Sequence, residues 1–205
     1  MISNFLSDKK QLFDSWASSY DWLFPSIFYQ AIHKRLLSKV DLPPQANVLD
    51  LGCGTGRLLQ RLADEFPDIR GTGLDFSPQM LRVARQKNSH HPRLIYVEGK
   101  AESLPFAEGQ FNAVFNTISF LHYSQPKQVL SEVARVLTPG GRFYLVDITT
   151  SKTASELAAA SPAKIRFYSR ESREALGSTA GLLSISHHYL LGPVLLTIFA
   201  KPSLT

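Results

Sequence analysis

A glycine-rich run near residue 50 carries the residue types best suited to holding a charged small molecule. The run reads VLDLGCGTG from Val48 to Gly56, and its apolar letters predict a buried strand over residues 47–51 that turns into a helix. Glycines at such a turn let the backbone approach a ligand, and the helix start offers free N–H groups. Gly52, Gly54 and Gly56 are therefore candidate binding residues.

Two details of this run narrow the range of ligands that it could bind. The dinucleotide fingerprint G-x-G-x-x-G would need a glycine at position 57, which is Arg57. Asp50 stands two residues before Gly52, where a carboxylate would repel a pyrophosphate and attract a cation. One such charge pair at about 4 Å is worth on the order of 4 kcal/mol at an effective dielectric of about 20, before desolvation. The run favours a cationic ligand over NAD. The alternative is that the glycines serve only packing.

Asp75 is the next candidate, at the end of the second strand-like run. It lies about 20 residues after Gly52, a distance at which an acidic residue can accept both ribose hydroxyls. Phe76 could then cover one face of a base. The alternative is that Asp75 caps the following helix, although Ser77 and Pro78 already read as its cap and first residue.

Strand-like and helical patterns alternate through the middle of the chain. We expect strands over residues 47–51, 70–75, 93–98, 112–117 and 142–148, with helices over 55–66, from Ser77, and over 128–137. A helix over 170–178 and two strands over 182–190 and 194–200, joined at Leu191-Gly192-Pro193, should follow. This alternation predicts an α/β fold with a doubly wound, mostly parallel sheet of seven strands and helices on both faces.

Composition excludes several other classes of protein. The chain has 205 residues, a net charge of +5 and one cysteine, Cys53. A single cysteine excludes an internal disulfide and a cysteine-based zinc site, and we expect no metal. No apolar run is long enough to span a membrane and no signal peptide is evident, so we expect a cytoplasmic protein. The densest basic cluster, Arg166, Arg170 and Arg173, is interrupted by acidic residues, and we interpret it as a solvated surface that binds no nucleic acid.

Five stretches in order now resemble the class I S-adenosylmethionine-dependent methyltransferases, particularly the type 11, quinone-biosynthesis-like branch that acts on small molecules. They are VLDLGCGTG, GLDFSPQML from Gly73, GKAESLPF from Gly99, EVARVLTPGG from Glu132 and FYSRESREALGSTAGL from Phe167. The resemblance implies S-adenosylmethionine as the cofactor. It also implies a Rossmann-like sheet whose last strand inserts antiparallel between parallel neighbours.

The resemblance assigns the cofactor's parts to particular residues. The methionine end would be held by the glycine turn and Asp50, the ribose by Asp75, and the adenine region by residues near positions 76–80 and 101–102. The implied set is Asp50, Gly52, Gly54, Gly56, Asp75, Phe76, Met80, Ala101, Glu102 and Asn116, the last near the amino group and the methyl. Lys100 departs from the family, which usually has an acidic residue there; lysine has no acceptor for the adenine amino group.

The catalytic candidates are His122 and Tyr20. His122 could remove a proton from an acceptor that must lose one, or it could be a structural histidine. In related enzymes the segment before the first strand forms a lid over the cofactor. We therefore divide one structural domain into a helical lid over 1–41 and a cofactor-binding part over 42–205. Phe13, Trp16 and Tyr20 share a helical spacing, and a second helix should run over 26–40. Tyr20 could face the sulfonium through a cation–π contact.

We expect methyl transfer to a small apolar or aromatic acceptor by a monomer or weak dimer. The place after the fourth strand reads Asn116-Thr117-Ile118-Ser119, without the Asn-Pro-Pro-aromatic motif of enzymes that methylate amino groups of bases or glutamine. The alternative function is non-catalytic binding of S-adenosylmethionine or S-adenosylhomocysteine by a protein of the same fold.

Overall fold

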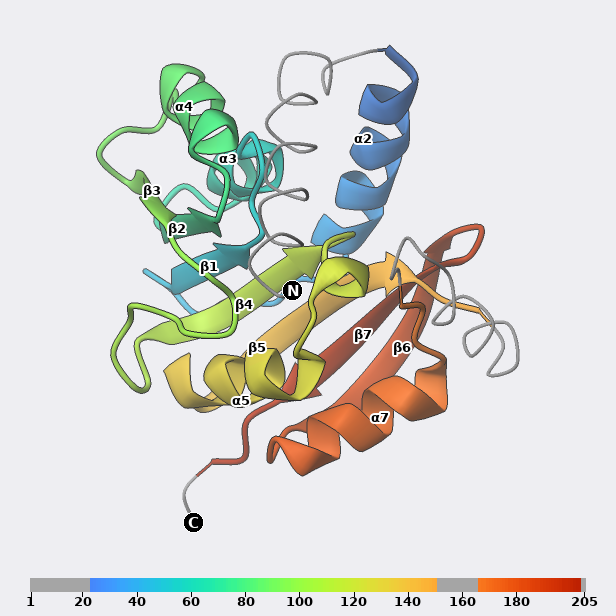
Figure 1. The fold of residues 1–205 in the computed structure, drawn as a ribbon. Coiled ribbons are helices and arrows are strands. Elements are labelled where there is room, and N and C mark those ends of the chain that lie inside the picture. The colour runs from blue at the N-terminus through green and yellow to red at the C-terminus, as the bar shows by residue number, and fades with distance from the viewer. Residues whose placement is uncertain (1–22, 151–165, 204–205) are drawn as a thin grey trace, which may run out of the picture.

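The computed structural model describes residues 23–150 and 166–203. Seven strands form one sheet in the order β3-β2-β1-β4-β5-β7-β6 (Figure 1). Their bounds are β1 Asn47–Leu51, β2 Arg70–Asp75, β3 Leu94–Glu98, β4 Phe111–Thr117, β5 Leu137–Ile148, β6 Leu183–Leu191 and β7 Val194–Ala200.

The sheet is parallel except for β7. Parallel pairing joins β1 to β2 and β4, β2 to β3, and β4 to β5. Strand β7 pairs antiparallel with both β5 and β6, so it inserts between two strands that run in the same direction. The expected seven-stranded sheet with an inserted antiparallel last strand is therefore confirmed, and the fold is Rossmann-like.

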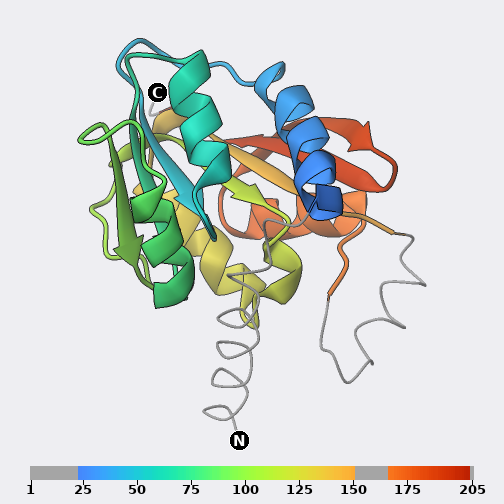
Figure 2. The ribbon, with the colours of Figure 1, turned by 90° about the horizontal axis from the view of Figure 1, so that it is seen from above.

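Helices cover both faces of the sheet (Figures 1 and 2). Helices α2 (Leu23–Leu37), α3 (Arg57–Glu65) and α4 (Pro78–Gln86) contribute to the core on one face. Helices α5 (Pro126–Val136) and α7 (Arg170–Thr179) lie on the other face, where a second cluster of buried apolar side chains packs. A short 3₁₀ helix, η1 (Phe120–His122), follows β4.

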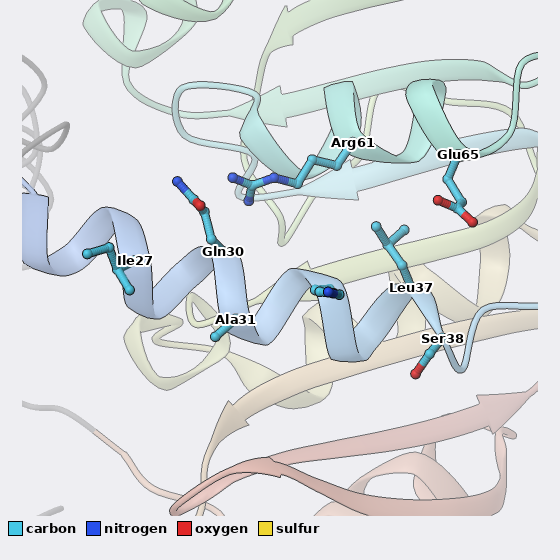
Figure 3. Close-up of a pocket in the computed structure, with 8 residues that line it drawn as sticks. Ile27, Gln30, Ala31, Leu37, Ser38, Arg61 and Glu65 are labelled. Atoms are coloured by element: carbon cyan, nitrogen blue, oxygen red, sulfur yellow. The ribbon is translucent and has the colours of Figure 1, made fainter.

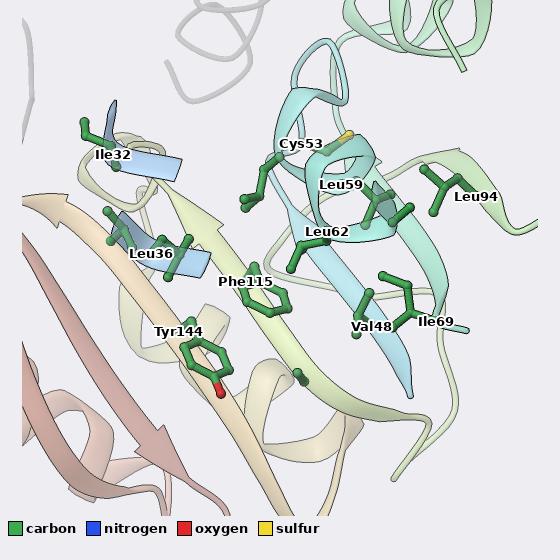
Figure 4. Close-up of a cluster of buried hydrophobic side chains, with 14 of the residues drawn as sticks. Ile32, Leu36, Val48, Cys53, Leu59, Leu62, Ile69, Leu94, Phe115 and Tyr144 are labelled. Atoms are coloured by element: carbon green, nitrogen blue, oxygen red, sulfur yellow. The ribbon is translucent and has the colours of Figure 1, made fainter. Parts of the chain in front are cut away.

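The first of these cores packs around the middle strands. Phe115 of β4 and Tyr144 of β5 stack with ring centroids 4.8 Å apart, and Leu36 of α2 and Leu62 of α3 belong to the same cluster (Figure 4). Strands β4 and β5 are buried on both faces because helices cover both sides of a parallel sheet. This rigid centre fixes the loops at the carboxyl ends of β1, β4 and β5.

Local sequence explains most element boundaries. The Ser77 side chain accepts a hydrogen bond from the Met80 N–H at 3.3 Å, and Pro78 opens α4, as predicted. Helix α2 covers Leu23–Leu37 where a helix over 26–40 was expected, and its first turn includes Pro25, since proline is tolerated there. Strand β5 begins at Leu137 instead of Arg142: Leu137 pairs with Phe111 before an irregularity that contains Gly140 and Gly141.

The basic cluster of the C-terminal third is only partly the solvated surface that we predicted. Arg166 and Arg170 are exposed. Arg173 is 1% exposed and lies under β5 and β7, so for this residue the prediction was wrong. A charge pattern in sequence does not show which member of the pattern points inward.

Candidate active site at the carboxyl ends of the strands

The glycine turn after β1 has the left-handed backbone that only glycine adopts freely. Gly52, Gly54 and Gly56 have φ values of 73°, 52° and 77°. A Cβ at Gly52 would lie 2.5 Å from the Ser119 Oγ, whereas a Cβ at Gly54 would meet nothing within 4 Å. Gly54 is therefore the point at which the turn's backbone faces open space, as close approach of a ligand requires.

Asp75 links this turn to the turn after β2. Its Oδ2 accepts a hydrogen bond from the Gly54 N–H at 2.8 Å, and its Oδ1 accepts one from the Ser77 N–H at 2.9 Å. Asp75 thus has the structural role that we considered as an alternative, in addition to any role in binding. A carboxylate has about four lone-pair positions, so one such group can accept from both backbone N–H groups and from a further donor.

Asp50 is a buried carboxylate beside a second one. It is 2% exposed, and burial together with the nearby negative charge of Asp75 raises its pKa to about 7. Both causes disfavour the ionised carboxylate, and a cationic partner would stabilise it, so Asp50 suits an ammonium group.

Asn116, near the end of β4, lies at the same edge of the sheet as Asp50, because β1 and β4 are parallel neighbours. Its Nδ2 donates to the Leu51 carbonyl at 2.8 Å, the Ser119 Oγ at 2.6 Å and the Tyr123 Oη at 3.0 Å. Its Oδ1 is buried without a hydrogen-bond partner. Because a buried acceptor without a donor costs free energy, this oxygen is a candidate contact for a ligand N–H.

The remaining predicted binding residues follow β2 and β3. Ala101 is 5% exposed and Met80 of α4 is 3% exposed. Phe76 and Glu102 are half-buried, and the Glu102 carbonyl accepts from the Gln128 side chain of α5 at 3.3 Å. Lys100 is exposed, and its backbone forms an isolated antiparallel β-bridge with Ser103. Their contacts with a cofactor stay predictions.

One catalytic candidate lies among the described residues and the other lies outside them. His122 ends η1, is half-buried, and donates its backbone N–H to the Ser119 carbonyl at 3.0 Å. Tyr20, the aromatic positions before it and most of the predicted lid lie outside the described residues.

Sequence reasoning missed three residues around η1. Asp147, buried at the end of β5, accepts the Leu121 N–H at 2.9 Å, and Tyr123 joins the Asn116 hydrogen-bond group. Ile118 has a φ of 50°, which is rare for a β-branched side chain. Asp147 carried a usable signal, since it is an acidic residue near the end of a predicted strand, as Asp75 is.

A separate hollow of about 650 Å³ lies between α2 and α3 (Figure 3). Its lining residues are Ile27, Gln30, Ala31, Lys34, Leu37, Ser38, Arg61 and Glu65. They include none of the predicted site residues, and the Arg61 guanidinium is already bonded to the Nδ1 of His33 at 2.6 Å. We assign the binding site to the glycine turn, where chemistry and geometry agree, and not to this hollow.

The described residues at this edge fit S-adenosylmethionine. Asp50 offers an unmatched buried negative charge, Asn116 an unpaired acceptor, and Gly54 a backbone open to approach. These groups complement a ligand that carries an ammonium group and a positive sulfonium.

Comparison with known proteins agrees with this fit. A methyltransferase domain model matches residues 48–141, beginning at the glycine run. An uncharacterized methyltransferase of Synechocystis sp. is 36% identical over 149 residues, which are 67% of this chain and 68% of that protein. The 2-phytyl-1,4-naphtoquinone methyltransferase of Thermosynechococcus vestitus is 31% identical over 154 residues, covering 73% and 68%.

Solved structures show the same fold. The structure of a Haloferax volcanii methyltransferase in complex with the Trm112 methyltransferase activator covers 93% of this chain and 97% of its own, with a TM-score of 0.78 and 24% identity. A methyltransferase of Aquifex aeolicus covers 91% and 97%, with a TM-score of 0.73 and 19% identity. With the relatives of higher identity, these findings show that the chain belongs to the class I S-adenosylmethionine-dependent methyltransferases.

Proposed function

We propose that this protein transfers the methyl group of S-adenosylmethionine to a small, apolar, aromatic acceptor of the quinol type. The observation that supports S-adenosylmethionine as the methyl donor is the combination of three features at one edge of the sheet. These are the buried Asp50 carboxylate, the unpaired Asn116 Oδ1 and the open backbone at Gly54. The acceptor half is supported by the names of relatives: besides the phytyl-naphthoquinone enzyme, a demethylmenaquinone methyltransferase of Thermus thermophilus is 33% identical over 140 residues.

When bound, S-adenosylmethionine supplies an activated methyl group on a good leaving group. The chain's own residues then mainly bind and orient, because a well-aligned pair of reactants can reach an effective molarity of roughly 10⁵ M or more. Asp50 would pair with the ammonium and Asn116 Oδ1 would accept one of its protons. Asp75 would accept the ribose hydroxyls while it keeps Gly54 and Ser77 in place.

His122 is the proposed base for an acceptor that must lose a proton. It lies on η1, which follows β4 directly and is therefore at the same edge of the sheet as Asn116. A neutral imidazole can accept a proton from an acceptor hydroxyl within hydrogen-bond reach. We also propose that residues 1–41 cover this edge and that Tyr20 contacts the sulfonium; the aromatic composition of that segment supports the idea.

The direct test is product formation. The purified protein is incubated with S-adenosylmethionine and a reduced, short-chain demethylmenaquinone, and the mass increase of one methyl group is followed by mass spectrometry. Asp50→Asn is expected to lose at least tenfold in kcat/KM. Tight binding of S-adenosylhomocysteine without methylation of any quinol would contradict the proposed acceptor and favour a non-catalytic binder.

We further infer a cytoplasmic monomer or weak dimer that does not act on nucleic acid. The scattered distribution of its basic residues and its one free, buried cysteine support this. In the described part of the chain, no helix is both long and apolar enough to cross a membrane. Light scattering across a concentration series would test the oligomeric state, and a DNA-binding assay at physiological salt would test the statement on nucleic acid.

A further inference from the structure

Asp147 holds the turn that carries His122. This carboxylate stands near the end of β5 and is 2% exposed. Its Oδ2 accepts the Leu121 N–H at 2.9 Å and its Oδ1 accepts the Ile148 N–H at 2.7 Å. One side chain therefore fixes both the middle residue of η1 and the strand end beneath it.

Arg173 of α7 holds Asp147 in turn. Its side chain is buried, and among the residues that the structure describes its guanidinium donates to backbone carbonyls from three different segments. These are Asp147 and Ile148 at the end of β5 (3.0 and 3.3 Å), Leu195 of β7 (2.9 Å) and Tyr168 before α7 (3.3 Å). Arginine's five donors in a rigid fork suit such a task, because they constrain several acceptors at once.

The turn between β4 and η1 needs such support because its backbone is strained. Ile118 has a φ of 50°, a conformation that costs a β-branched residue on the order of 1–3 kcal/mol. Its N–H is bonded to the Val146 carbonyl at 2.8 Å. From the other side, the Arg166 N–H donates to the Leu121 carbonyl at 3.1 Å, and the Arg166 guanidinium donates to the Ser124 carbonyl at 3.1 Å.

We propose that Asp147 is a positioning residue for methyl transfer: it fixes η1 so that His122 faces the acceptor, and Arg173 holds it in place. The link to catalysis rests on the proposed function, whereas the link to the geometry of η1 does not. Strained backbone maintained by buried polar contacts is typical of active sites, where it preserves a geometry that the free chain would leave.

The protonation state of Asp147 should control this support. Burial raises its pKa to about 6, against the lowering effect of the backbone N–H groups of Leu121, Ile148 and Phe120 and of the Arg173 charge. The other ionisable groups on the elements around it include His122 on η1, Arg166 and Tyr168 before α7, and Arg170, Glu171 and Glu174 on α7. Protonation removes the negative charge that strengthens the N–H bonds to this carboxylate, so the turn should loosen as the pH falls below about 6.

The experiment compares Asp147→Asn with Asp68→Asn. Asp68 is exposed and its Oδ2 also accepts a backbone N–H, that of Gln45 at 2.8 Å, so it is a matched control outside the site. In Asp147→Asn the amide donates where it should accept, so Leu121 or Ile148 loses a hydrogen bond. We expect amide hydrogen exchange at that residue to speed up by roughly tenfold or more, with no such change in the control.

The kinetic part separates positioning from general destabilisation. We expect kcat to fall roughly tenfold and KM for S-adenosylmethionine to stay within about twofold. If the variant does not fold, Arg173→Lys should give the same split between kcat and KM. Unchanged exchange at both Leu121 and Ile148 would overturn the anchoring, and faster exchange with wild-type kcat would overturn the positioning role. If the protein shows no activity on a quinol, only the proposed function is contradicted, because the exchange measurement of the anchoring needs no acceptor.

Discussion

The Asp50 carboxylate should lower the stability of the free protein and strengthen the binding of S-adenosylmethionine. Its pKa rises from 3.8 to about 7 in the folded protein, so between these values the folded state binds more protons than the unfolded state. The free energy of unfolding of the free protein therefore falls as the pH rises through this range. We predict that Asp50→Asn raises the melting temperature at pH 8 while it weakens S-adenosylmethionine binding.

The same residue should make cofactor binding depend on pH. An ammonium group prefers the ionised carboxylate, so binding should release a proton from Asp50 at about pH 7 or below. Below that pH the dissociation constant should rise, by up to about tenfold per unit. Calorimetry in buffers of different ionisation enthalpy measures the released proton, and a pH-independent dissociation constant between pH 6 and 8 would refute this.

Lys100 gives a second prediction for a single residue. Its exposed ammonium stands where the resembled family has an adenine acceptor. We predict that Lys100→Asp tightens S-adenosylhomocysteine binding, measured by calorimetry, because a carboxylate can accept from the adenine amino group. Equal or weaker binding would show that another group already makes this contact; Lys127→Asp on the exposed surface of α5 controls for the charge change.

At the scale of the element, two glycine variants can separate the effect of backbone strain from the effect of lost ligand contact. Gly54→Ala places a Cβ in open space at a φ of 52°, and Gly109→Ala does the same at a φ of 60° in a loop elsewhere. Both should lose about 1–2 kcal/mol of stability from left-handed strain. Only Gly54→Ala should weaken S-adenosylmethionine binding, by at least tenfold, because its methyl group occupies the space open to the ligand. Thermal melts and calorimetry on both variants make the comparison, and equal affinities would remove Gly54 from the site.

At the scale of the whole molecule, the N-terminal segment can be tested as a lid. The described residues contribute two clusters of buried apolar side chains, one on each face of the sheet. We predict that deleting these residues leaves a folded protein whose kcat falls at least tenfold, because water then enters the site. Circular dichroism and the quinol assay check the two halves, and Tyr20→Ala shows whether one ring carries the effect. A truncated protein with full turnover would exclude a lid.

The sequence predicted the architecture and the candidate binding residues better than it predicted the buried residues that hold the site in place. The bounds of β1, β2 and β7 match because apolar runs end at glycine, aspartate or turn residues there. The start of β5 was missed because pairing with Phe111 extends the strand through residues of low strand propensity. Arg173 and Asp147 were missed in their roles because their partners lie 22 to 26 residues away in sequence. No local pattern records such contacts.

The position of β7 has a consequence for how the chain is made. Strand β7 lies between β5 and β6, and its pairing covers Arg142 to Ile148 on one side and Leu183 to Leu191 on the other. During synthesis from the N-terminus, β5 therefore keeps one open hydrogen-bonding edge while α7 and β6 are produced. An exposed strand edge can pair with another chain, so a nascent chain at this stage is open to aggregation. Ribosome-bound chains stalled before Val194 should accordingly recruit chaperones that chains stalled well after Ala200 have released.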